Sequence, residues 1–257
     1  MCSMSEQWRF LLTPNKTAFE NMAIDWAVLK ANSRGLVPPT VRFYTWKPSA
    51  ISIGYFQSLK EEVDLDMCKR LGVDYVRRIT GGGAVYHEHE LTYSIVIPES
   101  HPEISKNIME SYSRICGALI RGLKRLGINS QYVPINDVVV DGKKISGSAQ
   151  TRKSKTVLQH GTVLLDVDVD KMFSLLRVPS EKIRDKLISD VKQRVTSIKH
   201  VLGEELSFEE VADAMKTGFE EEFNVELVDG GLTRTELEDS KRFEKNYFSS
   251  YEWNHRK

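Results

Sequence analysis

The sequence predicts an α+β fold, with mixed or antiparallel sheets in the front two thirds and helices behind them. Two observations favour this class. Short runs of β-branched and aromatic residues, separated by turn residues, recur between residues 41 and 165, and apolar residues at helical spacing dominate after residue 170. No internal repeat, low-complexity segment or obvious linker divides the chain. We therefore expect a single catalytic domain over residues 1–257, with a helical C-terminal part from about residue 168.

The predicted elements of the first half alternate between helix and strand. Apolar residues from Phe19 to Leu29 recur every three to four positions, which predicts an amphipathic helix. The turn residues 47–49 separate two strand-like runs and suggest a hairpin. The remaining elements expected here are strands at 41–46, 50–55, 74–78 and 91–97 and a helix at 64–71.

The second half begins with a long helix and a second hairpin. An apolar stripe from Ile104 to Leu126 ends at Gly127, as a helix does. Asp141-Gly142 is a two-residue turn between the strands expected at 137–140 and 144–146, and a further strand follows at 157–165. Two capping boxes, at residues 207–210 and 233–236, announce two of the later helices.

Composition bounds the function before any motif is considered. The chain has 257 residues, 40% hydrophobic and 28% charged, with 36 basic and 36 acidic side chains, so no net field directs it to nucleic acid or membrane. Its three cysteines, Cys2, Cys68 and Cys116, are odd in number and scattered, which fits reduced thiols. Without a signal sequence or a membrane-length apolar run, we expect a cytoplasmic protein.

Residues 77–87 hold the most informative motif. Gly81, Gly82 and Gly83 leave backbone amides bare of side chains, so a ligand can lie against the main chain. A triple glycine alone is more often a tight connection between strands. Here Arg77 and Arg78 precede it and His87 follows it, and this grouping suits an activated acyl group or a phosphate.

Lys144 is the strongest candidate for catalysis. A lysine after an Asp-Gly turn is often merely solvated, as we expect for Lys143. Lys144, however, is followed by the small residues 145–149, which let a ligand approach a cation closely. Asn136-Asp137 offers an amide and a carboxylate for a nucleotide and its magnesium, although this pair is also ordinary turn chemistry. His160-Gly161-Thr162 adds polar groups at the start of an apolar strand, where a histidine beside the core is the plainer interpretation.

These motifs together resemble a known family. Residues 77–87, 136–140, 144–149 and 160–165 are similar, in order and spacing, to the catalytic domain of the lipoate-protein ligase A family. The resemblance covers nearly the whole chain, from Trp8 to Asn254. It implies the biotin/lipoate protein ligase fold.

The resemblance also implies a two-step reaction. Lipoate and ATP give lipoyl-adenylate, which a lysine of an apo lipoyl domain or of glycine-cleavage H protein then attacks. Lys144 would be the catalytic residue, bridging the acyl carbonyl and the phosphate, and Asp137 would hold Mg²⁺. By the same resemblance, the lipoyl-adenylate would be bound by Arg78, Gly81, Gly82, Gly83, His87, Asn136, Asp137, Ser146, Gly147, Ala149, His160 and Thr162.

Two departures from the family pattern leave alternatives open. Residues 88–93, 148–152 and 158–161 look more like octanoyltransferases of the same superfamily, which use octanoyl-acyl carrier protein and a nucleophilic cysteine. Residues 128–141, where those transferases carry this cysteine, contain none, and its absence favours the ATP-dependent ligase. The chain also stops where the catalytic domain would stop, so we expect a small accessory protein to assist adenylation. We further expect Arg77, Arg78, Lys143 and Lys144 to form a basic rim for an acceptor with acidic flanks.

Two other functions are weaker alternatives. A non-catalytic module that binds lipoyl domains would have no need of the arginine, glycine and lysine positions. A biotin ligase would carry a glycine- and arginine-rich loop that this sequence lacks. The sequence therefore predicts an ATP-dependent lipoate-protein ligase, with octanoyltransferase as the main alternative.

Overall fold

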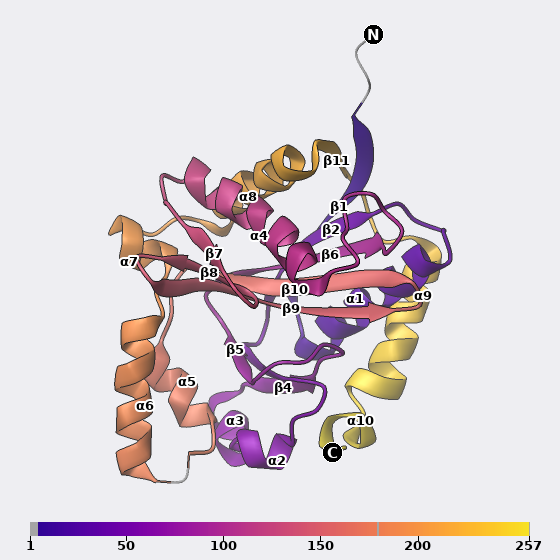
Figure 1. Ribbon diagram of the computed structural model, residues 1–257. Helices are drawn as coiled ribbons and strands as arrows, with labels where there is room; N and C mark the ends of the chain where they lie inside the picture. Colours follow the sequence, from indigo (N-terminus) through magenta and orange to yellow (C-terminus); the bar gives the residue numbers. More distant parts are fainter. Residues whose placement is uncertain (1–4, 179, 257) are drawn as a thin grey trace.

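The computed structural model describes residues 5–178 and 180–256 and confirms the α+β class (Figure 1). One large mixed sheet crosses the molecule, and a small sheet lies on one side of it. The large sheet has eight strands in the order β11-β1-β2-β6-β10-β9-β8-β7. These strands are β1 (Glu6–Lys16), β2 (Thr40–Trp46), β6 (Glu90–Pro98), β7 (Gln131–Val133), β8 (Asp137–Val140), β9 (Lys143–Lys153), β10 (Thr156–Leu164) and β11 (Val225–Asp229).

The small sheet has three strands, with β3 (Ala50–Ile53) between β4 (Asp74–Arg77) and β5 (Val85–His87). The sequence predicted a hairpin between 41–46 and 50–55, and this was wrong. β2 pairs with β1 and β6 in the large sheet, whereas β3 pairs with β4 and β5 in the small one. The chain thus passes from one sheet to the other between Trp46 and Ala50.

Helices cover both faces of the large sheet. On one face, α4 (Ile108–Arg125) packs against α8 (Phe208–Phe223), and α1 (Ala18–Ser33) lies on the other face with α9 (Arg234–Phe243) beside it (Figure 1). The remaining helices are α2 (Leu59–Glu62), α3 (Leu65–Leu71), α5 (Val169–Leu175), α6 (Glu181–Arg194), α7 (Ile198–Leu202), the π-helix η1 (Glu244–Phe248) and α10 (Tyr251–His255). Both predicted capping boxes form, at Ser207 and Thr233.

The C-terminal part is not wholly helical. β11 follows α8 and pairs in parallel with β1, so the segment after residue 168 contributes an edge strand to the large sheet. The sequence analysis predicted neither β11 nor β1. Within the described ranges, no helix combines the length and the apolar character that crossing a bilayer requires.

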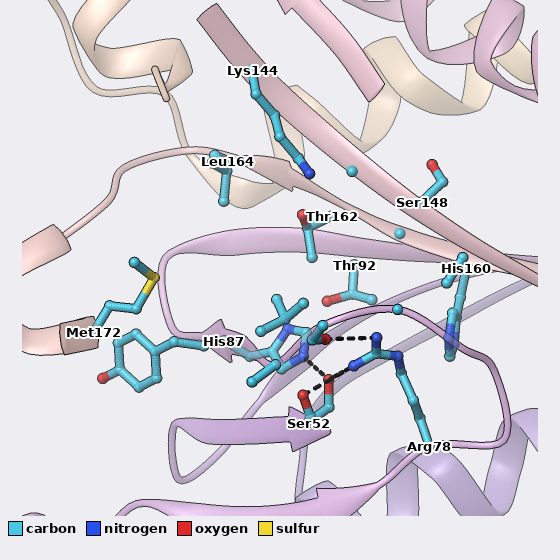
Figure 2. A pocket seen from close by; sticks show the side chains of 18 of the residues that line it. Ser52, Arg78, His87, Thr92, Lys144, Ser148, His160, Thr162, Leu164 and Met172 are labelled. Carbon is cyan, nitrogen blue, oxygen red and sulfur yellow. Dashed lines mark hydrogen bonds between the residues drawn. The ribbon is translucent and has the colours of Figure 1, made fainter. Parts of the chain in front are cut away.

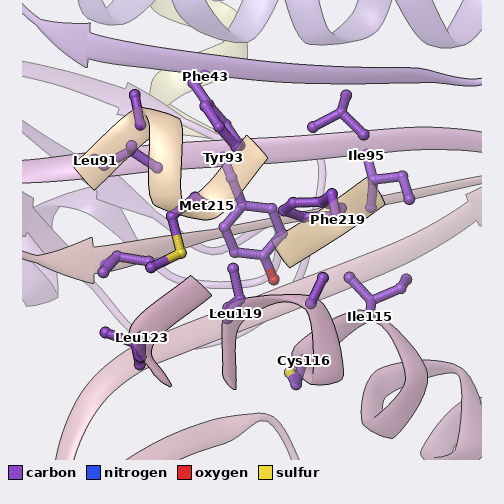
Figure 3. Close-up of a cluster of buried hydrophobic side chains, with 14 of the residues drawn as sticks. Phe43, Leu91, Tyr93, Ile95, Ile115, Cys116, Leu119, Leu123, Met215 and Phe219 are labelled. Carbon is purple, nitrogen blue, oxygen red and sulfur yellow. The ribbon is translucent and has the colours of Figure 1, made fainter. Parts of the chain in front are cut away.

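Alternation along β6 separates the core from the functional side of the sheet. Leu91, Tyr93 and Ile95 point toward α4 and α8, where they pack with Leu119 and Phe219 (Figure 3). The residues between them, among which are Thr92 and Ser94, point toward α1 and the small sheet, because successive side chains of a strand face opposite ways. The large sheet therefore presents polar side chains to the space above the small sheet.

Candidate active site

A cavity of about 320 Å³ lies between the large sheet and the small sheet, a size typical of small-molecule sites. Its wall carries both polar and apolar side chains, and in the close-up Met172 lies apart from Arg78 and His160 (Figure 2). Its lining residues are Met22, Tyr44, Trp46, Ser52, Arg78, Gly82, Gly83, Ala84, Val85, Tyr86, His87, Thr92, Asn136, Lys144, Gly147, Ser148, Ala149, His160, Gly161, Thr162, Leu164, Val167, Met172, Val191 and Val195.

Lys144 projects into this cavity from the start of β9, just after the predicted Asp141-Gly142 turn (Figure 2). Its carbonyl oxygen accepts a 2.8 Å hydrogen bond from the amide of Thr196, which fixes its backbone. Its Nζ lies 2.8 Å from Oδ1 of Asp137. A Cβ at position 147 would stand 2.5 Å from Cε of Lys144, so Gly147 leaves the space that the lysine side chain needs.

The glycine loop is held by Arg78. Its guanidinium donates to the carbonyl oxygens of Gly81, Gly83 and Ser52 and to Oγ of Ser52, at 2.8 to 3.2 Å. Burial lowers the pKa of Arg78 to about 10. Arg78 lines the cavity, but its N–H groups donate mainly to backbone carbonyl oxygens. Arg78 therefore orders the glycine loop, whether or not it also contacts a ligand.

Arg77 joins the segment after β3, residues 54–57, to the C-terminal helix α10. It is fully buried and donates to three carbonyl oxygens in residues 54–57 and three in residues 253–256. The expected basic rim was therefore wrong for the two arginines, because Arg77 and Arg78 are 0% and 5% exposed. Their charge is directed inward at backbone dipoles.

His87 lies under the cavity between two polar side chains. Its Nε2 is 2.8 Å from Oγ of Ser52, and its Nδ1 is 2.6 Å from Oε1 of Glu90. The ring stacks on Trp46 with centroids 4.1 Å apart and an interplanar angle of 16°. The imidazole is thus fixed in both position and plane.

His160 has a comparable environment on β10. Its Nε2 lies 2.7 Å from Oγ1 of Thr80, and its Nδ1 lies 3.2 Å from Oδ2 of Asp25. Burial lowers the pKa of His160 below its usual 6.5, although Asp25 opposes this shift. Burial would raise the pKa of Asp25, but Arg42, at 2.7 Å, and His160 hold it below its usual 3.8. A neutral His160 beside an ionised Asp25 follows.

Asn136 and Asp137 are engaged within the protein. Nδ2 of Asn136 donates to the carbonyl oxygen of Ser148 at 2.5 Å, and Asp137 pairs with Lys144. Across residues 5–178 and 180–256, no three His, Cys, Asp or Glu side chains gather into a metal cluster. Mg²⁺ at Asp137 would need further oxygen ligands from a bound substrate, and this assignment stays a prediction.

The cysteines of the described chain lie outside the cavity wall. Cys68, on α3, and Cys116, on α4, are both free and buried, and Figure 3 shows Cys116 in the core beside Leu119. Burial raises the pKa of the Cys68 thiol to about 11 and that of Cys116 to about 12. Both therefore behave as structural residues, and Cys2 lies outside the described residues.

The structure brings most of the predicted site residues to one cavity. Gly81, Asp137 and Ser146 are not among the lining residues, although Asp137 contacts Lys144 and Arg78 binds the carbonyl of Gly81. The predicted residues that do line it are Arg78, Gly82, Gly83, His87, Asn136, Lys144, Gly147, Ala149, His160 and Thr162.

Sequence reasoning missed Ser52, Glu90 and Asp25, which bind the two histidines. Ser52 stands in a strand-like run and Asp25 in a predicted helix, where single polar residues are common. Glu90, three residues after His87, offered a local signal: a carboxylate within reach of a histidine in the same motif.

Comparison with known proteins agrees with this geometry. The family model of the lipoyl protein ligase A/B catalytic domain matches residues 17–220. The chain belongs to this family. Among solved structures, a bi-partite lipoate protein ligase from Thermoplasma acidophilum aligns with a TM-score of 0.88 at 30% identity, covering 97% of this chain and 96% of that one. A lipoate-protein ligase A bound with ATP aligns with a TM-score of 0.82 at 27% identity, covering 98% and 99%.

Curated relatives that match over their full length carry another activity in their names. Octanoyltransferase LipM of Kyrpidia tusciae is 40% identical and that of Brevibacillus brevis is 38% identical, each covering 98% of this chain and 100% of the relative. Octanoyltransferase LipM of Bacillus subtilis is 34% identical over 98% of this chain and 99% of the relative.

These relatives overturn the predicted ATP-dependent ligase activity. The prediction gave decisive weight to Asn136-Asp137 and to the missing cysteine. In the structure, Asn136 donates to the backbone of Ser148 and Asp137 pairs with Lys144. Residues 88–93, 148–152 and 158–161, which look like those of the octanoyltransferases, were the better guide. The chain is an enzyme of the lipoyl protein ligase A/B family.

Proposed function

We propose that the chain is an octanoyltransferase, which moves an octanoyl group from octanoyl-acyl carrier protein to the ε-amine of a lysine on an apo lipoyl domain or glycine-cleavage H protein. The observation that carries the proposal is the cavity, which joins an apolar wall to a polar end at Lys144 and the glycine loop. Full-length similarity to octanoyltransferases supports the same reaction.

The polar end suits the chemistry of acyl transfer. Attack on a thioester places negative charge on the carbonyl oxygen, and the ammonium group of Lys144 can stabilise this charge at short range. Gly82 and Gly83 line the cavity and are exposed, so a ligand can approach their backbone closely. A thioester is already activated, so the reaction needs neither ATP nor a Mg²⁺ ion to activate the acyl group.

The apolar end suits a medium-length acyl chain. Leu164 ends β10, Met172 lies on α5 and Val191 on α6, and Val167 lies between β10 and α5. These side chains come from separate elements and together form the apolar part of the cavity wall. Burial of methylene groups against them contributes about 0.8 kcal/mol each and keeps water from the reacting carbonyl.

Partners and compartment follow from the same proposal. The acyl carrier protein is the donor and the apo lipoyl domain or H protein is the acceptor. The accessory protein was expected only for adenylation, so the proposed reaction gives it no role. We infer a cytoplasmic enzyme, because its described cysteines are free and buried as in reducing compartments.

Intact-mass analysis of an apo lipoyl domain tests the proposal. The purified chain is incubated with the domain and octanoyl-acyl carrier protein, without ATP, and in parallel with free lipoate or octanoate with and without ATP. We expect the mass of one octanoyl group to appear on the domain from the carrier-protein thioester alone. Labelling from a free acid only when ATP is present would overturn the proposed donor.

Lys144→Met and Lys143→Met form a matched pair for this assay. Both remove one positive charge from the same strand, but Lys143 is not a lining residue of the cavity. We expect Lys144→Met to lower the transfer rate by about 10²- to 10³-fold, the usual cost of an electrostatic group at a reacting oxygen. Lys143→Met should retain the wild-type kcat, and a part of Lys143 in the predicted basic rim would change only KM for the acceptor domain. Equal effects of the two variants would contradict the role of Lys144.

A further inference from the structure

A continuous chain of hydrogen bonds runs beneath the cavity from Trp46 to Arg78. Nε1 of Trp46 lies 2.7 Å from Oγ1 of Thr92, which lies 2.5 Å from Oε1 of Glu90. Glu90 contacts Nδ1 of His87 at 2.6 Å, and Nε2 of His87 contacts Oγ of Ser52 at 2.8 Å. Nη1 of Arg78 lies 3.1 Å from the same Oγ. Figure 2 shows the last two links at the floor of the cavity.

The donor-only groups at the two ends of the chain fix the direction of its two terminal hydrogen bonds. Indole and guanidinium nitrogens can only donate, so Thr92 must accept from Trp46 and Ser52 must accept from Arg78. The hydroxyl of Thr92 then donates to the carboxylate of Glu90, to which Nδ1–H of His87 also donates. When His87 donates through Nδ1 alone, its Nε2 is an acceptor, and the hydroxyl of Ser52 can donate to it.

This arrangement has the elements of an activated serine nucleophile. The hydroxyl points at an imidazole nitrogen, and a buried carboxylate holds the other nitrogen in the required tautomer. Ser52, His87 and Glu90 are each at most 5% exposed, and Ser52 and His87 line the cavity. The guanidinium of Arg78 adds a positive charge beside the oxygen, which stabilises a developing alkoxide.

The second histidine does not offer an equivalent nucleophile. Thr80, His160 and Asp25 are connected in the same sense, but Thr80 is 0% exposed and is not a cavity-lining residue. Ser148 does line the cavity, yet its contacts are to Tyr93 and Cys116, neither of which is a base. Ser52 is therefore the hydroxyl of the described chain that meets both requirements, access to the cavity and an imidazole partner.

Ser52 is also close to the glycine loop. The guanidinium of Arg78 binds Oγ of Ser52 through Nη1 and the carbonyl oxygen of Gly83 through Nη2, at 3.1 and 2.8 Å. One planar group therefore spans the distance between the serine oxygen and the loop backbone. A thioester bound along the loop would lie beside the serine.

We propose that Ser52 carries the acyl group as a covalent oxoester, with His87 as general base and acid and Glu90 as the residue that positions His87. This inference rests on the proposed octanoyltransferase function. It replaces the cysteine thiolate, because Cys68 and Cys116 are buried outside the cavity with raised thiol pKa values.

The chemistry balances without a further reactant. Oγ of Ser52 attacks the thioester carbonyl, its proton passes to Nε2 of His87, the C–S bond breaks, and the proton leaves with the thiol of the carrier protein. The acceptor lysine amine then attacks the oxoester, the C–N bond forms as the C–Oγ bond breaks, and His87 returns a proton from the amine to Oγ of Ser52. No oxidant, reductant or nucleotide takes part.

The covalent intermediate can be observed directly. The chain is mixed with octanoyl-acyl carrier protein in the absence of acceptor, quenched with acid and analysed by intact mass and peptide mapping. We expect one octanoyl group on the peptide that contains Ser52, stable to neutral hydroxylamine as an oxoester is. Addition of apo lipoyl domain before the quench should move the label to the acceptor lysine.

Substitution at Ser52 separates chemistry from structure. Ser52→Ala should form no adduct and should lower transfer by on the order of 10³-fold or more. Ser52→Cys should form an adduct that neutral hydroxylamine removes, since the linkage becomes a thioester. Ser111→Ala is the matched control: Ser111 is a fully buried serine on α4 that bonds Gln150 and is not a lining residue, so its variant should transfer at the wild-type rate.

Glu90→Gln tests the positioning role. A carboxamide keeps the size of Glu90, and its Oε1 can still accept from His87 and Thr92, but it carries no negative charge to stabilise an imidazolium at His87. We expect kcat for transfer to fall by about 10²-fold or more while KM for octanoyl-acyl carrier protein stays near its wild-type value. A rise of KM alone would show that Glu90 supports only binding.

The remaining outcomes each overturn the proposal in a distinguishable way. An adduct on any cysteine, Cys2 included, would replace Ser52 as the acyl carrier. Wild-type transfer by Ser52→Ala without an adduct would show direct attack by the acceptor lysine. Both results would leave octanoyl transfer by the wild-type chain intact, whereas failure of that transfer would remove the proposed function itself.

Discussion

Nζ of Lys144 and Oδ1 of Asp137 form an ion pair of 2.8 Å across the β8–β9 hairpin. Gly147, which pairs with Asp137, has no Cβ and so leaves room for the lysine side chain. Both side chains are partly exposed, at 41% and 32%, so the pair contributes little to stability. The ion pair orients the side chain of Lys144, because the carboxylate of Asp137 holds Nζ in one position.

Asp137→Asn should therefore affect catalysis more than folding. Without the charge, Lys144 samples other rotamers, and we expect kcat for octanoyl transfer to fall by about 10- to 100-fold. The unfolding free energy should change by less than about 1 kcal/mol. Parallel kinetic and urea-unfolding measurements check this, and a large loss of stability with unchanged kcat would contradict it.

Chelation gives a second test of the same residue. The carboxylate of Asp137 pairs with Lys144, and no cluster of metal-binding side chains gathers in the described parts of the chain. We expect EDTA to leave the rate of transfer from octanoyl-acyl carrier protein unchanged. Inhibition by EDTA that Mg²⁺ reverses would return Asp137 to the metal-binding role that the sequence suggested.

Acid should destabilise the protein through His160. Burial lowers the pKa of His160 below 6.5, so the unfolded chain binds the proton first as the pH falls. The stability associated with a neutral His160 is fully present above pH 6.5 and is lost as the pH falls through the lowered pKa. Asp25 acts in the same direction, but only below its usual 3.8.

Urea unfolding at pH 7.5, 6.5 and 5.5 measures this effect. We expect the unfolding free energy of the wild type to decrease toward pH 5.5 and that of His160→Gln to decrease less, because the variant has no imidazole to protonate at this site. A wild-type chain that gains stability on acidification over this range would contradict the assignment of a neutral His160.

The two buried thiols should resist alkylation. With a pKa of about 12, only about one part in ten thousand of Cys116 is ionised at pH 8, and burial excludes the reagent as well. We expect iodoacetamide at pH 8 to leave Cys68 and Cys116 unmodified in the folded chain and to modify both after denaturation. Peptide mapping by mass spectrometry distinguishes the sites. Rapid modification of Cys116 in the folded chain would reopen it as a candidate nucleophile.

Local signals predicted the parts of the site that local geometry determines. Lys144 follows an Asp-Gly turn, and the capping boxes at residues 207–210 and 233–236 form within one helical turn. The hairpin predicted at 47–49 failed because pairing depends on partners far along the chain. β2 is buried on nearly all its residues between β1 and β6, and only the tertiary arrangement reveals this.

The hydrogen-bonded chain under the cavity lay beyond sequence reasoning for the same reason. Ser52 and His87 are 35 residues apart and meet because β3 and β5 pair antiparallel in the small sheet. Arg78 presents a related difficulty: its acceptors are mostly backbone carbonyl oxygens, which every residue has. A sequence can show that an arginine is present near a loop, but not that it faces inward.

Gly54 should be essential to the shape of the glycine loop. A Cβ at this position would stand 2.0 Å from the carbonyl oxygen of Gly82, and that backbone is in turn held through Arg78, so it cannot move aside easily. We expect Gly54→Ala to cost about 1–3 kcal/mol of unfolding free energy and to slow transfer, because the loop must shift from the cavity. Gly231→Ala is the control, since its Cβ would meet nothing within 4 Å. Equal stability of the two variants in urea unfolding would mean that the loop tolerates displacement, and the close packing of Gly54 under Gly82 would then not explain the order of the site.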